Sequence, residues 1–156
     1  MSPHQADSPG VRVPPPLVFL GGLGIGLALS TWAPTEYLGR TVARPLGGVL
    51  IGLGALLALS AFRAFHQAGT TIRPDRPGSA LVRTGPYRFT RNPMYLALTI
   101  VYAGIAVMNE SLWSLLLLPL VVFLIRSKVI AREEAYMERR FGVDYSHYKS
   151  EVRRWI

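Results

Sequence analysis

The stretch TGPYRFTRNPMY, residues 84–95, joins a basic loop to a long apolar segment. Gly85-Pro86 predicts a tight turn, because glycine tolerates positive φ and proline fixes its own φ. Asn92-Pro93 predicts the start of a helix, since asparagine is a preferred N-cap and proline is favoured at the first helical position. The helix should therefore begin at Pro93 and point its free N–H groups into the loop.

Long apolar segments surround this stretch. We predict membrane-spanning helices over residues 17–33, 46–65, 93–108 and 112–130. Half of the 156 residues are hydrophobic and only 17% are charged, whereas a soluble domain of this size rarely carries so many long apolar runs. The sequence therefore predicts an all-α polytopic membrane protein with four spans and one domain, residues 17–156, after a disordered tail over residues 1–16.

Short connections and small residues predict how these helices pack. Asn109-Glu110 forms a very tight turn and Ser111 can cap the helix that follows, so the last two spans should form an antiparallel hairpin. The first two helices should pack through glycine faces, because each carries a pair of glycines at the small-xxx-small spacing: Gly22 and Gly26, and Gly48 and Gly52.

The basic residues predict the orientation in the membrane. Six arginines lie in the loop over residues 62–92 and eight basic residues follow residue 125, whereas the opposite side holds only Arg40 and Arg44. Basic loops face the cytoplasm, so we expect a protein of the cell membrane with both termini cytoplasmic. The net charge of +8 then reflects membrane topology and not nucleic-acid binding.

Beyond the fourth span, the helix should continue into polar sequence on the cytoplasmic side. One face of it is expected to carry Arg126, Val129, Ile130, Glu133 and Met137. Gly142 should end this helix and Asp144 should cap a last one. An apolar stripe on the last helix suits a position on the membrane surface, and it comprises Tyr145, Tyr148, Val152 and Trp155.

The residue types exclude several kinds of chemistry. There is no cysteine, and the three histidines lack ligand spacing, so we expect no thiol nucleophile and no metal site. Arg88 and Arg91 with the helix N-terminus could attract an anion, and Tyr87 and Tyr95 could contact a base or a sulfonium. The same residues also fit a capped membrane helix with arginine anchors, and local physics leaves both interpretations open.

The chain resembles a family of membrane methyltransferases. The resemblance is carried by Gly85-Pro86-Tyr87, residues 91–95 (RNPMY), Glu133-Glu134 and residues 141–148 (FGVDYSHY). These occur in the order and spacing of the isoprenylcysteine carboxyl methyltransferases and the related phospholipid methyltransferases. The resemblance implies an S-adenosylmethionine pocket on the cytoplasmic side, built from residues 70–95 and 126–156, and a lipid-like or amphiphilic acceptor with a carboxylate or an amine.

The resemblance also implies roles for individual residues. Expected cofactor contacts are Ser79, Ala80, Leu81, Val82, Tyr87, Asn92, Pro93, Met94, Tyr95 and Glu133. Expected catalytic residues are Arg91, Asn92 and Tyr95, and candidate acceptor contacts are Arg126, Lys128 and Glu134. Two departures leave prenylcysteine in doubt as the acceptor: Asn92 replaces the histidine of eukaryotic members, and Val129 replaces a substrate-binding arginine.

Methyl transfer from a sulfonium is an in-line displacement that needs no nucleophile from the protein. The protein must align donor and acceptor and exclude water, which suits a site without cysteine, triad or metal. Two alternatives remain open. Membrane sterol reductases carry a similar Arg-x-Pro-x-Tyr element and bind NADPH, and a non-catalytic membrane protein could use these loops as anchors. The short chain and the Glu133-Glu134 pair favour the methyl donor.

Overall fold

A computed structural model describes residues 13–69 and 80–155, and in this part of the chain every regular element is helical. The elements are α1 (Pro15–Trp32), α2 (Arg40–Gln67), the 3₁₀ turn η2 (Gly85–Arg88), α3 (Pro93–Met108), α4 (Leu112–Leu124), the π-helical segment η3 (Ile125–Ile130), α5 (Ala131–Phe141) and α6 (Val143–Glu151). The prediction of an all-α protein is therefore confirmed. Ser79 and most of the expected tail lie outside the described residues.

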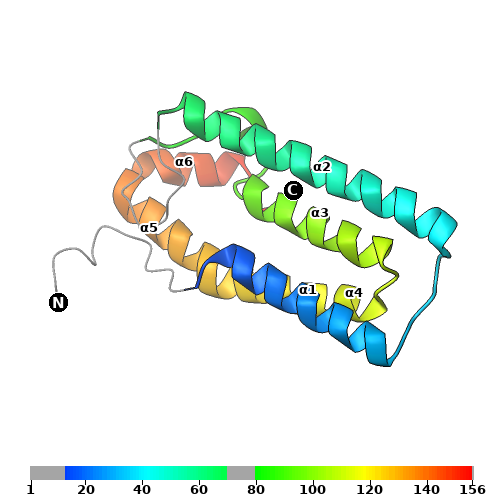
Figure 1. Cartoon of the computed structure of the whole chain (residues 1–156). Helices are drawn as coiled ribbons and strands as arrows, with labels where there is room; N and C mark the ends of the chain where they lie inside the picture. The colour runs from blue at the N-terminus through cyan, green and yellow to red at the C-terminus, as the bar shows by residue number, and fades with distance from the viewer. Residues whose placement is uncertain (1–12, 70–79, 156) are drawn as a thin grey trace.

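The first four helices form an antiparallel bundle in which α2 lies beside α3 and α1 lies beside α4 (Figure 1). The start of α3, together with α5 and α6, lies at one end of the bundle, and the α3–α4 turn lies at the other (Figure 1). This arrangement places the loop before α3 and the C-terminal helices at the same end, as the distribution of basic residues predicts.

Within residues 13–69 and 80–155, three helices are long and apolar enough to cross a membrane: α1, α2 and the continuous helix Leu112–Phe141. The expected third span is helical over its predicted bounds, but α3 has only 16 residues, fewer than the 18 of α1. The chain therefore has the helices of a membrane protein, and the fourth crossing stays a prediction.

Two helix starts differ from the prediction, and proline is the reason in both. The first helix begins at Pro15 and not at residue 17, because prolines are tolerated in the first turn. The second begins at Arg40 and not at residue 46, with Pro45 inside the helix. A proline near a helix start removes only one backbone hydrogen bond, so it does not mark the boundary.

The glycines mediate close helix contacts, but the expected partners were wrong. A Cβ added at Gly22 or Gly26 would lie 2.4 Å from α4 side chains, so α1 packs on α4 and not on α2. On α2 the close contacts come from Gly47 and Gly54, which face α3. The two glycines expected to mediate packing on α2, Gly48 and Gly52, make no such contact. A Cβ added at Gly48 would meet only the end of the Met108 side chain, and a Cβ added at Gly52 would meet nothing within 4 Å.

The α3–α4 turn confirms the predicted hairpin and its cap. The Ser111 hydroxyl accepts a hydrogen bond from the backbone N–H of Ser114 at 3.2 Å. It also lies 2.7 Å from the Ser30 hydroxyl and donates to the Gly26 carbonyl at 3.2 Å, so it joins α1 to the hairpin. The turn residue Glu110 has a positive φ of 50°, a conformation that few residues other than glycine adopt.

Replacing Ser111 by alanine should lower the free energy of unfolding by about 1–2 kcal/mol, because the cap and a buried inter-helix hydrogen bond are lost together. The measurement is unfolding of the detergent-solubilised protein in a denaturant titration. Ser127→Ala is the matched control, since the Ser127 hydroxyl is exposed and bonds only within its own helix. Equal losses in the two variants would contradict the assigned cap.

Two hydrophobic clusters meet at the start of α3. The first cluster contains Phe19, Leu23, Tyr102, Ala106, Val121, Ile125, Val129 and Ile130, and the second contains Ala61, Ala64, Val82 and Tyr87. Tyr95 packs against the first cluster, whereas Met94 packs against the second. The first turn of α3 is therefore fixed from both sides, which holds the residues around it in place.

The C-terminal segment folds onto the rest of the protein. Gly142, with φ +50°, ends α5 as predicted. The last helix begins at Val143, so Asp144 lies in its first turn and does not cap it. The expected stripe faces the protein, since Tyr145 and Tyr148 are each only 4% exposed. Their burial against the loop before α3 brings the chain end to the candidate site.

Candidate functional site

The turn before α3 places Tyr87 under the C-terminal helix. Gly85 adopts a positive φ of 60°, which confirms the predicted turn. The Tyr87 ring packs edge-on against Phe65 at 5.3 Å, and its carbonyl accepts a hydrogen bond from the Tyr148 hydroxyl at 2.7 Å. Burial raises the pKa of the Tyr87 phenol above its usual range, with smaller contributions from Tyr148 and Glu133. Tyr87 is therefore a neutral aromatic wall.

Asn92 stands at the predicted N-cap position of α3, but its side chain does not cap the helix. The amide Nδ2 donates to the Arg154 carbonyl at 3.0 Å, while the Asn92 backbone N–H donates to the Thr90 hydroxyl at 3.2 Å. The Thr90 hydroxyl also donates to the Arg154 carbonyl at 3.1 Å. The start of α3 is therefore held by the C-terminal segment.

Tyr95 and Glu133 meet across the site. The Tyr95 hydroxyl donates to Glu133 Oε1 at 2.7 Å, and this bond joins the first turn of α3 to the first turn of α5. Both residues are half-buried. The sequence separates them by 38 positions, so the contact brings together the two motif segments from which a cofactor pocket was predicted.

Glu134, the next residue, is bound by two arginines. Arg154 donates to both carboxylate oxygens, from Nε at 3.0 Å and from Nη2 at 2.5 Å. Arg91 Nη1 lies 3.1 Å from Glu134 Oε1, with both side chains about nine-tenths buried. Buried charges of this kind are tolerated because they are paired. The Nε atom of Arg91 is buried and has no hydrogen-bond partner in the described part of the chain.

Known proteins match most of this region. A family model described as phospholipid methyltransferase matches residues 42–144, about two thirds of the chain. The chain belongs to the phospholipid methyltransferase family. It is 36% identical over 122 residues to a phosphatidylethanolamine N-methyltransferase of Homo sapiens, covering 74% of this chain and 59% of the human protein.

An uncharacterized protein of Haemophilus influenzae is 40% identical to this family member over 68 residues, which cover 40% of this chain and the whole of that protein. The chain spans 59% of the length of the human relative. No solved structure matches the chain. The expected resemblance to phospholipid methyltransferases is therefore confirmed at the level of the family.

Most of the residues expected at the site lie together in this member of the phospholipid methyltransferase family. They are Tyr87, Arg91, Asn92, Pro93, Met94, Tyr95, Glu133 and Glu134. Of the residues just before the turn, Val82 is buried in the second cluster, whereas Ala80 and Leu81 are half-exposed. The cofactor and acceptor roles expected of these residues stay predictions.

Arg126 and Lys128 do not join the site, since both are exposed on η3. The sequence reasoning placed Arg126 on one helical face with Val129 and Ile130, which are buried. That expectation was wrong because a π-helical turn holds more residues than an α-helical turn and shifts the helical phase. The two cations point outward at the end of the apolar part of the helix.

Arg154 is the site residue that sequence reasoning missed. It was counted only among the cytoplasmic basic residues, and it lies beyond the segment that the family model matches. Its partners are 20 and 62 positions away, at Glu134 and Asn92. No local periodicity or spacing signals contacts over such separations, so only the folded chain reveals them.

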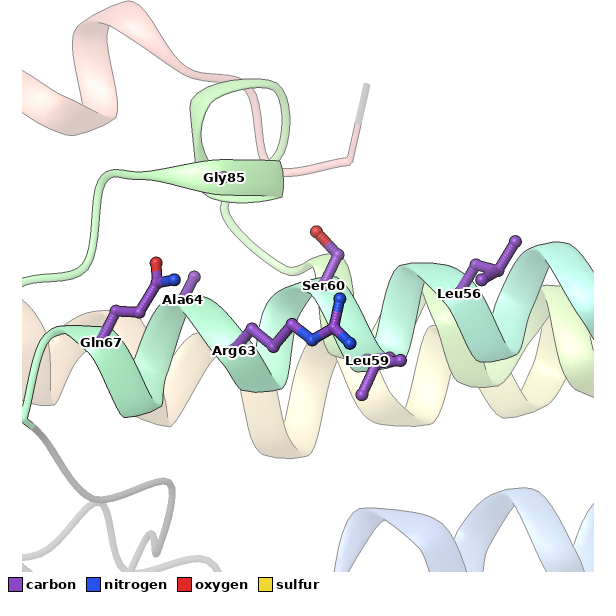
Figure 2. Close-up of a pocket in the computed structure, with 7 residues that line it drawn as sticks. All are labelled: Leu56, Leu59, Ser60, Arg63, Ala64, Gln67 and Gly85. Atoms are coloured by element: carbon purple, nitrogen blue, oxygen red, sulfur yellow. The ribbon is translucent and has the colours of Figure 1, made fainter.

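A surface hollow lies on the outer side of α2 and contains none of the expected site residues (Figure 2). It has a volume of about 250 Å³ and is lined by Leu56, Leu59, Ser60, Arg63, Ala64, Gln67 and Gly85. Leu56 lies at one end and Gln67 at the other, with Arg63 and Leu59 side by side between them (Figure 2). This hollow faces away from the bundle, so we assign it no part in the site around Tyr95.

Proposed function

We propose that the chain is an S-adenosylmethionine-dependent membrane methyltransferase that methylates the amine headgroup of a phospholipid at the cytoplasmic face. Membership of the phospholipid methyltransferase family and the name of the human relative support an amine acceptor. The observation that carries the proposal is the 2.7 Å bond between Tyr95 and Glu133. It joins both motif segments where the apolar helix α4 and the segment η3 give way to the polar helix α5.

The side chains around this bond fit the groups of the proposed methyl donor. The donor carries a carboxylate, an ammonium group and ribose hydroxyls. The Nε of Arg91, which is buried and has no hydrogen-bond partner among the described residues, and the N-terminus of α3, which carries no side-chain cap, suit the carboxylate. Glu133 suits the ammonium or ribose, because in the described part of the chain no cation forms an ion pair with it. Tyr87 and Tyr95 supply aromatic faces.

The arrangement also indicates what the protein contributes to the reaction. S-adenosylmethionine, when bound, supplies a methyl group that is already activated, so the protein has to hold two reactants in line and exclude water. Tyr87 and the first cluster wall the site on two sides. An amine must lose its proton before attack, and Glu134 is unsuited to accept it because two arginines bind its carboxylate.

The test is direct titration of the detergent-solubilised protein with S-adenosylmethionine, its demethylated product and NADPH. We expect micromolar affinity for the first two ligands and no binding of NADPH. Methyl transfer is then measured on vesicles that contain phosphatidylethanolamine, with phosphatidylcholine vesicles as the control because their headgroup nitrogen is fully methylated. Binding of NADPH alone would support a reductase, and binding of no ligand by folded protein would support a non-catalytic role.

A further inference from the structure

The C-terminal segment and the two halves of the site are connected through one residue, Arg154. Its guanidinium binds both carboxylate oxygens of Glu134, with N–O distances of 3.0 and 2.5 Å. A two-point contact between arginine and a carboxylate fixes direction as well as distance. Glu134 is only 8% exposed, so water screens this ion pair weakly. The side chain of Arg154 is therefore anchored to α5.

The backbone of the same segment is anchored to α3. The Arg154 carbonyl accepts hydrogen bonds from the Thr90 hydroxyl at 3.1 Å and from Asn92 Nδ2 at 3.0 Å. The neighbouring carbonyl, of Arg153, accepts from the backbone N–H of Arg91 at 3.0 Å. The carbonyls of Arg153 and Arg154 are thus hydrogen-bonded to the residues just before α3. These bonds fix the position of the start of that helix.

These contacts lie beside both partners of the hydrogen bond between Tyr95 and Glu133. Glu134 adjoins Glu133 in the sequence, and Asn92 is three residues before Tyr95. Any shift of α5 against the start of α3 would lengthen the bond between Tyr95 and Glu133. Arg154 resists such a shift, because its side chain binds one helix and its carbonyl binds the entry to the other.

We propose that Arg154 is a positioning residue of the donor pocket, which acts through Glu134 and Asn92 to keep Tyr95 and Glu133 in contact. This inference rests on the proposed function, and it concerns a residue beyond the family match, which ends at residue 144. It also assigns Glu134 a positioning role, in place of the acceptor role expected from the sequence, and Arg91 supports Glu134 through Nη1 while its Nε stays available for the donor carboxylate. The hydrogen bond to Glu134 raises the pKa of Arg154, so the guanidinium stays charged.

The experiment compares Arg154→Ala, Arg154→Lys and Arg153→Ala in the full chain. Arg153 is the matched control, because its side chain is exposed and only its backbone carbonyl contacts the site. We expect Arg154→Ala to weaken binding of S-adenosylhomocysteine roughly tenfold, as for loss of a charge-assisted hydrogen bond. The KM for S-adenosylmethionine should rise in parallel, whereas the KM for phosphatidylethanolamine should stay within about twofold. Lysine should restore part of the affinity, and Arg153→Ala should match the wild type.

Two results would overturn the inference while leaving the proposed function intact. One is unchanged binding of S-adenosylhomocysteine by Arg154→Ala, and the other is an equal rise in both KM values, which indicates general loss of structure. If Arg154→Ala fails to fold, Arg154→Gln and Glu134→Gln are combined, and the double variant should bind no more weakly than Glu134→Gln. Independent, additive losses would contradict the inference that Arg154 acts through Glu134. If the wild type binds no S-adenosylhomocysteine, the proposed function itself fails.

Discussion

Glu133→Ala should lower the affinity for S-adenosylmethionine about 100-fold, the largest loss that we expect from a single side chain in the site. The carboxylate of Glu133 is half-buried and accepts the Tyr95 hydroxyl at 2.7 Å. Its removal deletes the proposed partner of the ammonium or ribose groups and leaves the tyrosine hydroxyl unpaired. Losses of this size are typical of hydrogen bonds to charged groups. Calorimetric titration of the detergent-solubilised variant gives the dissociation constant directly.

Two further variants show whether the loss of affinity comes from the Glu133 carboxylate itself. Glu138→Ala removes a carboxylate from the same helix, but Glu138 is exposed and pairs with Lys149, so the affinity should not change. Tyr95→Phe keeps the ring and loses only the hydroxyl, and a loss of about tenfold or less is expected. Unchanged affinity in Glu133→Ala would show that its assigned role in donor binding is wrong.

Local signals in the sequence predict the helix ends well. Pro93 begins α3, Ser111 caps α4 and Gly142 ends α5, each where the residue type requires it. These features depend on the conformation of a few neighbouring residues, so no knowledge of the fold is needed. The same holds for the turn at Gly85, whose positive φ favours glycine.

Partner choice is not predictable from such signals. Asn92 is by residue type and position suited to cap α3. Its side chain instead donates to the Arg154 carbonyl, because the C-terminal segment lies within reach. Glu134 is suited by type to an acceptor ligand, yet Arg91 and Arg154 bind it. Each outcome depends on residues brought together by the whole fold, and the sequence alone offers several partners of equal chemistry.

Gly47→Ala should lower the free energy of unfolding by about 2 kcal/mol, because it forces α2 and α3 apart. The added Cβ would lie 2.5 Å from the Gly104 carbonyl oxygen, 2.6 Å from Met108 Cβ and 2.7 Å from the Met108 backbone nitrogen. None of these atoms is the end of a flexible side chain, so relief requires movement of the α3 backbone. Denaturant unfolding of the detergent-solubilised variant measures this loss.

Gly52→Ala is the matched control, because the same substitution on the same helix meets nothing within 4 Å. Alanine is a better helix former than glycine, so this variant should be unchanged or more stable by up to about 1 kcal/mol. The difference between the two variants therefore isolates the contact with α3 from helix propensity. Equal stability of Gly47→Ala and Gly52→Ala would show that α2 does not approach α3 through Gly47.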